Sequence, residues 1–174
     1  VLAAIKDGHS HFTNYQGDEI STLLDSPKQF PLVLTFEATR AFVVLNQGLD
    51  ERVKPGMEVL GINGQSLAEI LQRILPNLAQ DGDGRTYQMY QLGISRGFFQ
   101  QGRPGRAGFS EAYRLYVGNP LRFRTTVRDP RTRKSVEVDL AGVTPAEAAV
   151  YVEQNQVNRD VLTGLRTLRA VMGA

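Results

Sequence analysis

Residues 54–66 decide the fold of this 174-residue chain: Lys54-Pro55-Gly56-Met57-Glu58-Val59-Leu60-Gly61-Ile62-Asn63-Gly64-Gln65-Ser66. The Pro-Gly pair predicts a turn into a short apolar strand, Met57 to Ile62, and Asn-Gly is the strongest short-range signal that the chain then reverses. Ser66, with Glu69 three positions later, predicts a capping box at the start of a helix. The stretch therefore predicts turn, strand, turn and helix in that order.

The residues after Ser66 predict an amphipathic helix. Apolar positions recur three or four residues apart, which places them on one helical face: Leu67, Ile70, Leu71, Ile74, Leu75 and Leu78. Pro76 lacks a backbone N–H and predicts that the helix ends close to it. We expect this helix to close a β-rich domain.

Four further segments have the residue pattern of strands. Residues 32–36 and 41–45 are rich in β-branched and aromatic residues around a polar connection, which predicts a hairpin. Residues 121–127 and 136–140 alternate apolar and polar positions, and the turn at 129–133 joins them into a second hairpin. Strands and helix together predict an α+β fold.

The remaining segments predict helices and connections. Residues 81–118 are expected to be an insertion, with helical spacing from Thr86 to Phe99 and no regular structure in the glycine-rich stretch 102–108. Thr144-Pro145-Ala146-Glu147 combines an N-cap, a proline at the first helical position and a capping Glu. With a last helix predicted over roughly Val161 to Met172, residues 144–174 are expected to form a helical connector.

Composition excludes several classes of protein. Apolar residues make up 41% and charged residues 22% of the chain, as in an ordinary globular protein, and the absence of cysteine excludes disulfides and thiolate chemistry. No apolar run approaches the roughly 20 residues that span a bilayer. Val1 is not a start methionine, and we expect the chain to be a piece of a longer polypeptide.

The charge is unevenly distributed. Residues 96–134 hold ten basic and two acidic side chains, a net charge of +8 in a chain whose total is +2. Such a segment could attract a polyanion. However, Arg122, Arg124 and Arg128 are predicted on the polar side of a strand that Glu137 and Asp139 of the next strand can face. Nucleic-acid binding is therefore not expected, and a polyanion binder is the weaker alternative.

The stretch Gly56–Gly64 resembles the core motif "G-(D/E)-x-(I/V)-L-x-I-N-G" of bacterial PDZ domains. The resemblance implies a PDZ-like β-sandwich or partly open barrel over residues 30–143, with one main amphipathic helix and flanking helices. PDZ domains bind the C-terminal ends of peptides and are often regulatory parts of proteases.

A second resemblance lies at the N-terminus. Ile5-Lys6-Asp7-Gly8-His9-Ser10 resembles the "(L/I)-x-D-G-H-(S/T)" segment that precedes the PDZ-like domain of C-terminal processing (tail-specific, tricorn-like) serine peptidases. Asp81-Gly82 after the main helix also occurs in secreted bacterial members. The resemblance implies that residues 1–29 are the N-terminal segment of such a peptidase, and that a Ser nucleophile lies in a later domain of the same polypeptide.

His9 is the one candidate catalytic residue. In the tricorn-like branch the matching histidine is the general base toward the nucleophile, and an imidazole that titrates near neutral pH suits that role. In the branch with a Ser-Lys dyad the matching histidine is not the base. The remaining alternative is a turn residue whose ring bonds local backbone. The chain alone is expected to be inactive, and the whole protein would hydrolyse peptide bonds through an acyl-enzyme.

For peptide binding, the resemblance implies two sets of residues. The carboxylate-binding loop would lie near Phe30, Pro31, Leu32 and Val33, and the groove would lie between the strand containing Leu34 and the helix containing Leu67, Ile70 and Leu71. A peptide would add to the sheet as a further strand. Pro31 departs from the glycine-rich pattern and has no N–H to offer a carboxylate, so the alternative is a scaffold or lid.

No cofactor or metal site is predicted, because the only histidines, His9 and His11, have no carboxylate at ligand spacing. The expected partners are a peptide or protein substrate and the catalytic domain of the same polypeptide. The resemblance implies a periplasmic, cell-envelope or secreted location. A stand-alone interaction module without catalysis is the alternative function.

Overall fold

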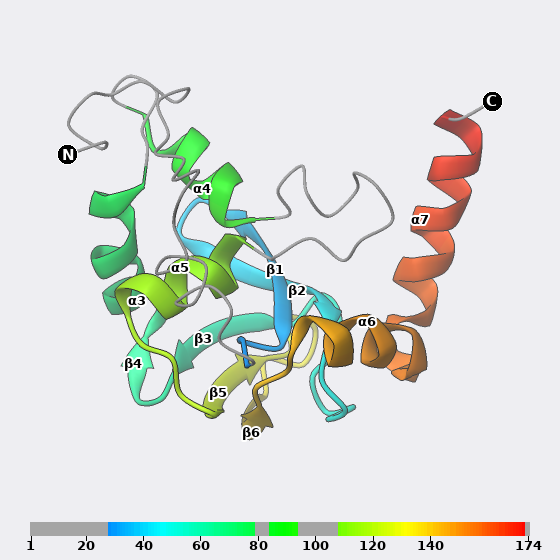
Figure 1. Ribbon diagram of the computed structural model, residues 1–174, viewed down its shortest axis with the longest axis horizontal. Helices are drawn as coiled ribbons and strands as arrows, with labels where there is room; N and C mark the ends of the chain where they lie inside the picture. The colour runs from blue at the N-terminus through cyan, green and yellow to red at the C-terminus, as the bar shows by residue number, and fades with distance from the viewer. Residues whose placement is uncertain (1–27, 79–83, 94–107, 173–174) are drawn as a thin grey trace, which may run out of the picture.

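The structure is a computed structural model that describes residues 28–78, 84–93 and 108–172 (Figure 1). It confirms the α+β class. Six antiparallel strands form one sheet: β1 (Leu32–Glu37), β2 (Arg40–Asn46), β3 (Glu58–Ile62), β4 (Gln65–Ser66), β5 (Arg122–Arg128) and β6 (Ser135–Ala141). The helices are α3 (Leu67–Ile74), α4 (Thr86–Leu92), α5 (Gly108–Tyr116), α6 (Pro145–Gln154) and α7 (Arg159–Met172), with 3-10 turns at Leu75–Asn77 and Gln156–Asn158.

The strand order is β1-β2-β3-β5-β6, with β4 paired to β3. The sheet is not closed into a barrel, and the expected PDZ-like sandwich or partly open barrel stays a prediction. The two ends of the sheet meet only where Gln29, before β1, exchanges backbone hydrogen bonds of 2.8 and 3.0 Å with Val143, after β6. A single bridge among the described residues does not make a ladder, so β1 remains an edge strand.

Both predicted hairpins are confirmed. β1 and β2 pair from Leu32↔Asn46 to Glu37↔Arg40, and β5 and β6 pair from Arg122↔Ala141 to Arg128↔Ser135. In the second turn, the Asp129 carboxylate accepts a 2.8 Å hydrogen bond from the Arg131 N–H. This local bond is the type by which Asp favours turns.

The predicted main helix is confirmed as α3. The Ser66 hydroxyl accepts from the Glu69 N–H at 3.3 Å and the Glu69 carboxylate accepts from the Ser66 N–H at 2.7 Å, which completes the capping box. Leu67, Ile70, Leu71 and Ile74 are buried. The α-helix ends at Ile74, and Pro76 lies in the 3-10 turn that follows.

The insertion contains two helices. The helix predicted from Thr86 is confirmed as far as Leu92, and its expected continuation beyond residue 93 lies outside the described residues. Helix α5 begins at Gly108, where the sequence predicted no regular structure. A Cβ at Gly108 would lie 1.9 Å from the Gln91 carbonyl oxygen, so only glycine permits the close approach of α5 to α4.

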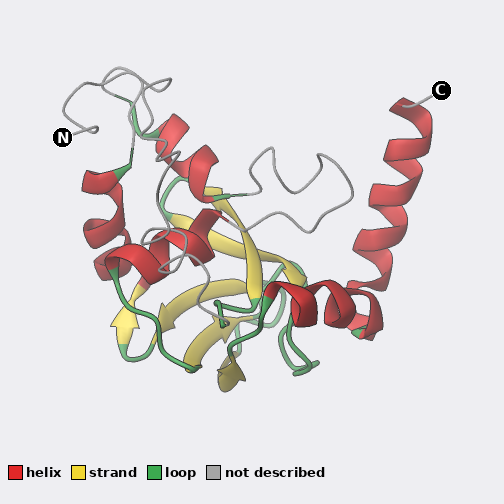
Figure 2. Ribbon diagram, viewed as in Figure 1, coloured by secondary structure: helices red, strands yellow, loops and turns green. Residues whose placement is uncertain are grey.

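Helices α3, α4 and α5 lie together over one face of the sheet, and α6 lies at β2 (Figure 2). The main core forms between the sheet and the first three helices. Val33 alternates with Leu32 and Leu34, so it points to the opposite face and packs with Leu45 and Val152 of α6 in a second core.

The capping box predicted at Thr144 and Glu147 is confirmed at the start of α6, and α7 begins at Arg159, two residues before its predicted start. The buried Asn158 amide holds this region to the sheet: its oxygen accepts from the Asn46 N–H at 2.9 Å and its NH₂ donates to the Asn46 carbonyl at 2.7 Å. From there α7 extends away from the body (Figure 1). In the part of the chain that the structure describes, no helix has the length and apolar character needed to cross a membrane.

Candidate peptide-binding site

The structure brings most of the expected peptide-binding residues together, but inside the core. Phe30, Leu32, Leu34, Leu67, Ile70 and Leu71 belong to the main core and are at most 6% exposed. Val33 belongs to the second core, and Pro31 is buried as well. Their side chains are not accessible to a peptide in this structure. His9 lies outside the described residues.

The space between β1 and α3 is occupied by the insertion. Helix α5 contacts both α3 and β1, and α4 runs along β1. The ring of Phe109 packs edge-on against Phe30 with centroids 5.6 Å apart, Tyr113 stacks on Phe30 at 6.3 Å, and the Ser110 hydroxyl donates to the Phe30 carbonyl at 3.3 Å. These contacts occupy the groove between β1 and α3 in which the peptide was expected to bind.

A peptide would not readily displace these helices. Burying a large apolar side chain contributes about 1.5–3 kcal/mol, so the four large buried side chains of α4 and α5 contribute about 6–12 kcal/mol: Met89, Leu92, Phe109 and Tyr113. A peptide with a dissociation constant of about 1 μM releases about 8 kcal/mol in total. The channel between β1 and α3 is therefore part of the fold while α5 is in place.

Near its hairpin turn, β1 directs backbone groups toward its outer edge. The N–H and C=O of Val43 bond to Met57 and Gly56, on the β3 side of β2. The backbone N–H and C=O groups of successive strand residues point alternately to the two sides of a strand, so those of Phe42 and of its partner Thr35 point toward each other. The backbone groups of the next residue, Phe36, then point toward the open edge of the sheet. At Leu34 this edge is covered, because Gly93 lies beside the Leu34 carbonyl. Phe36 is therefore the position where β1 can accept a further chain.

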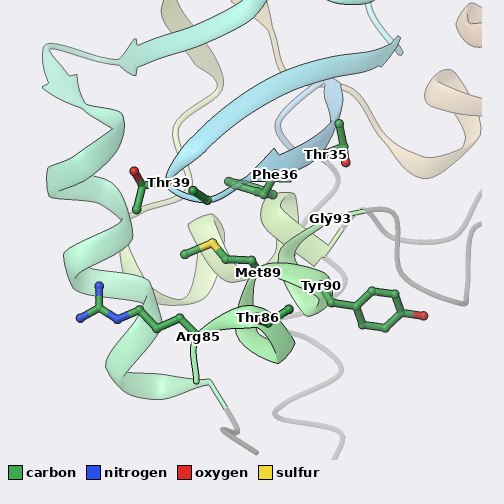
Figure 3. Close-up of a pocket in the computed structure, with 9 residues that line it drawn as sticks. Thr35, Phe36, Thr39, Arg85, Thr86, Met89, Tyr90 and Gly93 are labelled. Atoms are coloured by element: carbon green, nitrogen blue, oxygen red, sulfur yellow. The ribbon is translucent and has the colours of Figure 1, made fainter. Parts of the chain in front are cut away.

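A pocket of about 630 Å³ adjoins Phe36, between the β1–β2 hairpin and α4 (Figure 3). Its lining combines apolar groups with four hydroxyls: Thr35, Phe36, Ala38, Thr39, Arg85, Thr86, Met89, Tyr90 and Gly93. The Met89 side chain lies in the middle, below Phe36. The Arg85 guanidinium and Thr39 lie at one end, and the ring of Tyr90 extends at the other (Figure 3).

Arg85 is the one charged side chain in this lining. Arg85 is exposed and forms no ion pair with any of the described residues. Glu37, the acidic residue of the neighbouring β1–β2 hairpin, interacts electrostatically with Arg40. Within the part of the chain that the structure describes, the pocket thus combines an apolar middle with an unpaired positive charge at one end.

Three basic side chains of residues 96–134 pair with carboxylates on the sheet, partly as predicted. Arg122 binds Asp139 at 2.7 Å, and Arg124 lies 3.9 Å from Glu137. Arg128 instead donates at 2.6 Å to Glu58 of β3, so the expected pairing of Arg128 with the β6 acids is wrong. The reason is that β3, not β6, presents a carboxylate directly opposite it in the register Glu58↔Arg128.

Glu58 is 4% exposed and also accepts a 2.7 Å hydrogen bond from Arg40. Hydrogen bonds from Arg40, and then from Arg128, lower the pKa of the Glu58 carboxyl to about 2, although burial opposes the shift. Glu58 therefore stays ionised and joins β2, β3 and β5. Its role is structural, because both of its oxygens are bound by guanidinium groups.

Within residues 28–78, 84–93 and 108–172, no group of three or more His, Asp or Glu side chains is placed to hold a metal ion. His9 and His11 lie outside these residues. Nothing in the sequence singled out Arg85, Met89 or Tyr90, since the pocket forms only when α4 packs beside the hairpin tip. The spacing of Tyr87 and Tyr90 predicted the helix but not its partner.

A scan against models of protein families, a search of curated proteins and a search of solved structures each find no match to this chain. Function is therefore argued from the geometry of the site.

Proposed function

We propose that this chain is a non-catalytic module that holds an extended polypeptide, and that it is the PDZ-like, substrate-positioning part of a serine peptidase of the C-terminal processing type. The observation that carries the proposal is the outward-facing backbone of Phe36 beside a pocket of about 630 Å³. An edge strand offers main-chain hydrogen bonds to an added strand, and an adjacent pocket selects its side chains.

The arrangement of the sheet supports the PDZ-like part of the proposal. A hairpin with one free edge, a short strand ending in Asn-Gly and a main helix after it occur in the order that the resemblance implies. The position of the binding site differs from that expectation. Because α5 fills the channel beside α3, the peptide would bind at the hairpin end of β1, with α4 as the opposite wall.

The peptidase part of the proposal rests on the segment around His9, with the nucleophile in another domain. We expect no peptide cleavage by this chain alone. In a polypeptide that also carries the nucleophile domain, His9→Ala should lower turnover at least a hundredfold if His9 is the general base, since general-base catalysis contributes about 10²–10⁴-fold. Unchanged turnover would remove His9 from the mechanism and leave peptide binding standing.

Peptide binding is tested by filling the pocket. We expect a fluorescein-labelled pool of capped hexapeptides, with a central Phe or Leu and randomised flanks, to bind in an anisotropy titration. Thr39→Trp places an indole at the pocket from an exposed position and should weaken binding at least tenfold. Thr132→Trp, at the exposed tip of the other hairpin, is the matched control. Equal binding by Thr39→Trp and Thr132→Trp would refute this site. If His9→Ala abolishes cleavage by the longer polypeptide but leaves peptide binding unchanged, the peptidase part and the binding part of the proposal are separated.

A further inference from the structure

We propose that the pocket selects a particular class of polypeptide, one in which a bulky apolar side chain lies two residues away from an Asp or Glu side chain. In this reading Phe36 and Met89 receive the apolar group and Arg85 binds the carboxylate. The inference rests on the proposed function, and it adds the chemistry by which that site recognises its ligand.

The middle of the pocket is apolar, and we therefore expect it to receive an apolar side chain of the ligand. Met89 is 9% exposed and joins the main core, and Phe36 packs against the same core, so their remaining surface forms a fixed apolar wall. Phe36 also contacts the buried ring of Phe109 with centroids 5.9 Å apart. A thioether side chain adapts to different apolar shapes, which suits a site that accepts more than one bulky residue.

The acidic part of the ligand follows from charge complementarity. Among the described residues, Arg85 is the one charged group of the lining and has no anionic partner, and none of those that line the pocket is a carboxylate. By contrast, Arg40, which follows the same hairpin turn, is held by Glu58. A guanidinium presents a fork of donors that matches a carboxylate.

The distance between the two parts of the ligand is set by extended geometry. Successive residues of a strand are about 3.3 Å apart, so neighbours on one side are separated by about 7 Å. Figure 3 shows the Arg85 guanidinium beyond the end of the Met89 side chain, on the side of Thr39. A peptide that placed its apolar residue over Met89 would bring the side chain two positions away, on the same side of the strand, within reach of the flexible Arg85.

The carboxylate is assigned to an internal acidic side chain and not to a chain terminus. A terminal carboxylate is generally bound by a nest of free backbone N–H groups. The stretch before β1 does not provide one, because Pro31 has no N–H, and Pro31 and Leu32 are both buried. The pocket instead offers a side-chain cation.

The experiment uses three hexapeptides, each acetylated at the N-terminus and amidated at the C-terminus, that share a Phe and differ only in the residue two positions away from it: Glu, Gln or Lys. Anisotropy titrations at low and high salt compare the wild-type chain with Arg85→Gln and Arg85→Glu. Arg131→Glu, which reverses an exposed arginine at the β5–β6 turn, is the matched control.

We expect the wild-type chain to bind the Glu peptide about three- to tenfold more tightly than the Gln peptide, a range typical of an exposed charge pair, and less so at high salt. Arg85→Gln should remove this preference while keeping affinity for the Gln peptide, and Arg85→Glu should favour the Lys peptide. A merely structural arginine would not produce that reversal of preference.

Several results overturn the inference. If the wild-type chain binds all three peptides equally, or if Arg131→Glu changes the preference as much as Arg85→Glu, the pocket does not recognise an acidic side chain and the proposed function still stands. If none of the capped peptides binds while a peptide with a free C-terminus does, the carboxylate is the terminus. If no peptide of either kind binds, the proposed function itself fails.

Discussion

Replacing Glu58 by Gln tests how the sheet is held together. Glu58 is the one carboxylate that both Arg40 and Arg128 bind, at 2.7 and 2.6 Å, and its side chain is only 6% exposed. Glu58→Gln keeps the shape and the capacity to accept a hydrogen bond but removes the charge. The remaining neutral amide can no longer balance two guanidinium groups.

The magnitude follows from the pKa of Glu58. Hydrogen bonds from Arg40 and Arg128 lower this pKa from 4.5 to about 2, and a shift of that size corresponds to about 3 kcal/mol. Both guanidinium groups are about half exposed, and solvent screens such pairs, so we expect about 1–2 kcal/mol. Because the folded-state pKa is the lower one, this stability is present above pH 4.5 and is lost as the pH falls toward 2.

Urea denaturation of the wild-type chain and Glu58→Gln, followed by circular dichroism between pH 7 and pH 2.5, measures the difference. We expect the wild-type chain to be more stable by about 1–2 kcal/mol at pH 7, and the gap to narrow below pH 4.5. Glu137→Gln is the control, since its pair with Arg124 spans 3.9 Å between side chains about 60% exposed. A gap that stays constant over the whole pH range would refute the assignment of charge pairing to Glu58.

Three further substitutions test the core packing, a helix cap and a buried hydrogen-bonded amide. Phe109→Ala should lower the free energy of unfolding by about 3–5 kcal/mol, because a fully buried ring is removed. Leu115→Ala on the same helix is the control: Leu115 is 46% exposed, so its loss should change the free energy of unfolding by less than about 1 kcal/mol. Thermal denaturation compares the two variants. Ser66→Ala should cost about 1 kcal/mol in the same assay through loss of the capping box, and an unchanged melting temperature would contradict that role. Asn158→Ala leaves the buried Asn46 N–H and C=O without partners, so hydrogen exchange over residues 145–162 should accelerate by at least tenfold while exchange in β5 stays slow.

Local signals predicted most of the fold. The Ser66 and Thr144 capping boxes, the Asn63-Gly64 turn and the two hairpins each depend on residues within a few positions of one another, and each is present. Such features can be read from one sequence because the interacting groups are neighbours in the chain.

Features that depend on distant residues were missed. Arg128 and Glu58 are 70 positions apart, and only the β3–β5 register brings them together. Helix α5 was missed for a related reason. Its start, Gly108, follows a glycine-rich stretch that predicts a loop, and what favours a helix is the burial of Phe109 and Tyr113 against Phe30, a residue about 80 positions earlier.

The candidate site depends on the same long-range packing. A motif in the sequence can indicate which strand is the edge and which helix is the main one, but it cannot indicate what a long insertion covers. Here the insertion places Phe109 over Phe30 and removes the channel beside α3 from solvent, and it places α4 across from the hairpin tip, where Phe36, Met89 and Arg85 meet. The helices that close the expected groove therefore also build the pocket. It follows that a variant lacking α4 and α5 would not simply uncover a groove, because it would also lose Met89 and Arg85, the two side chains that give the proposed site its chemistry.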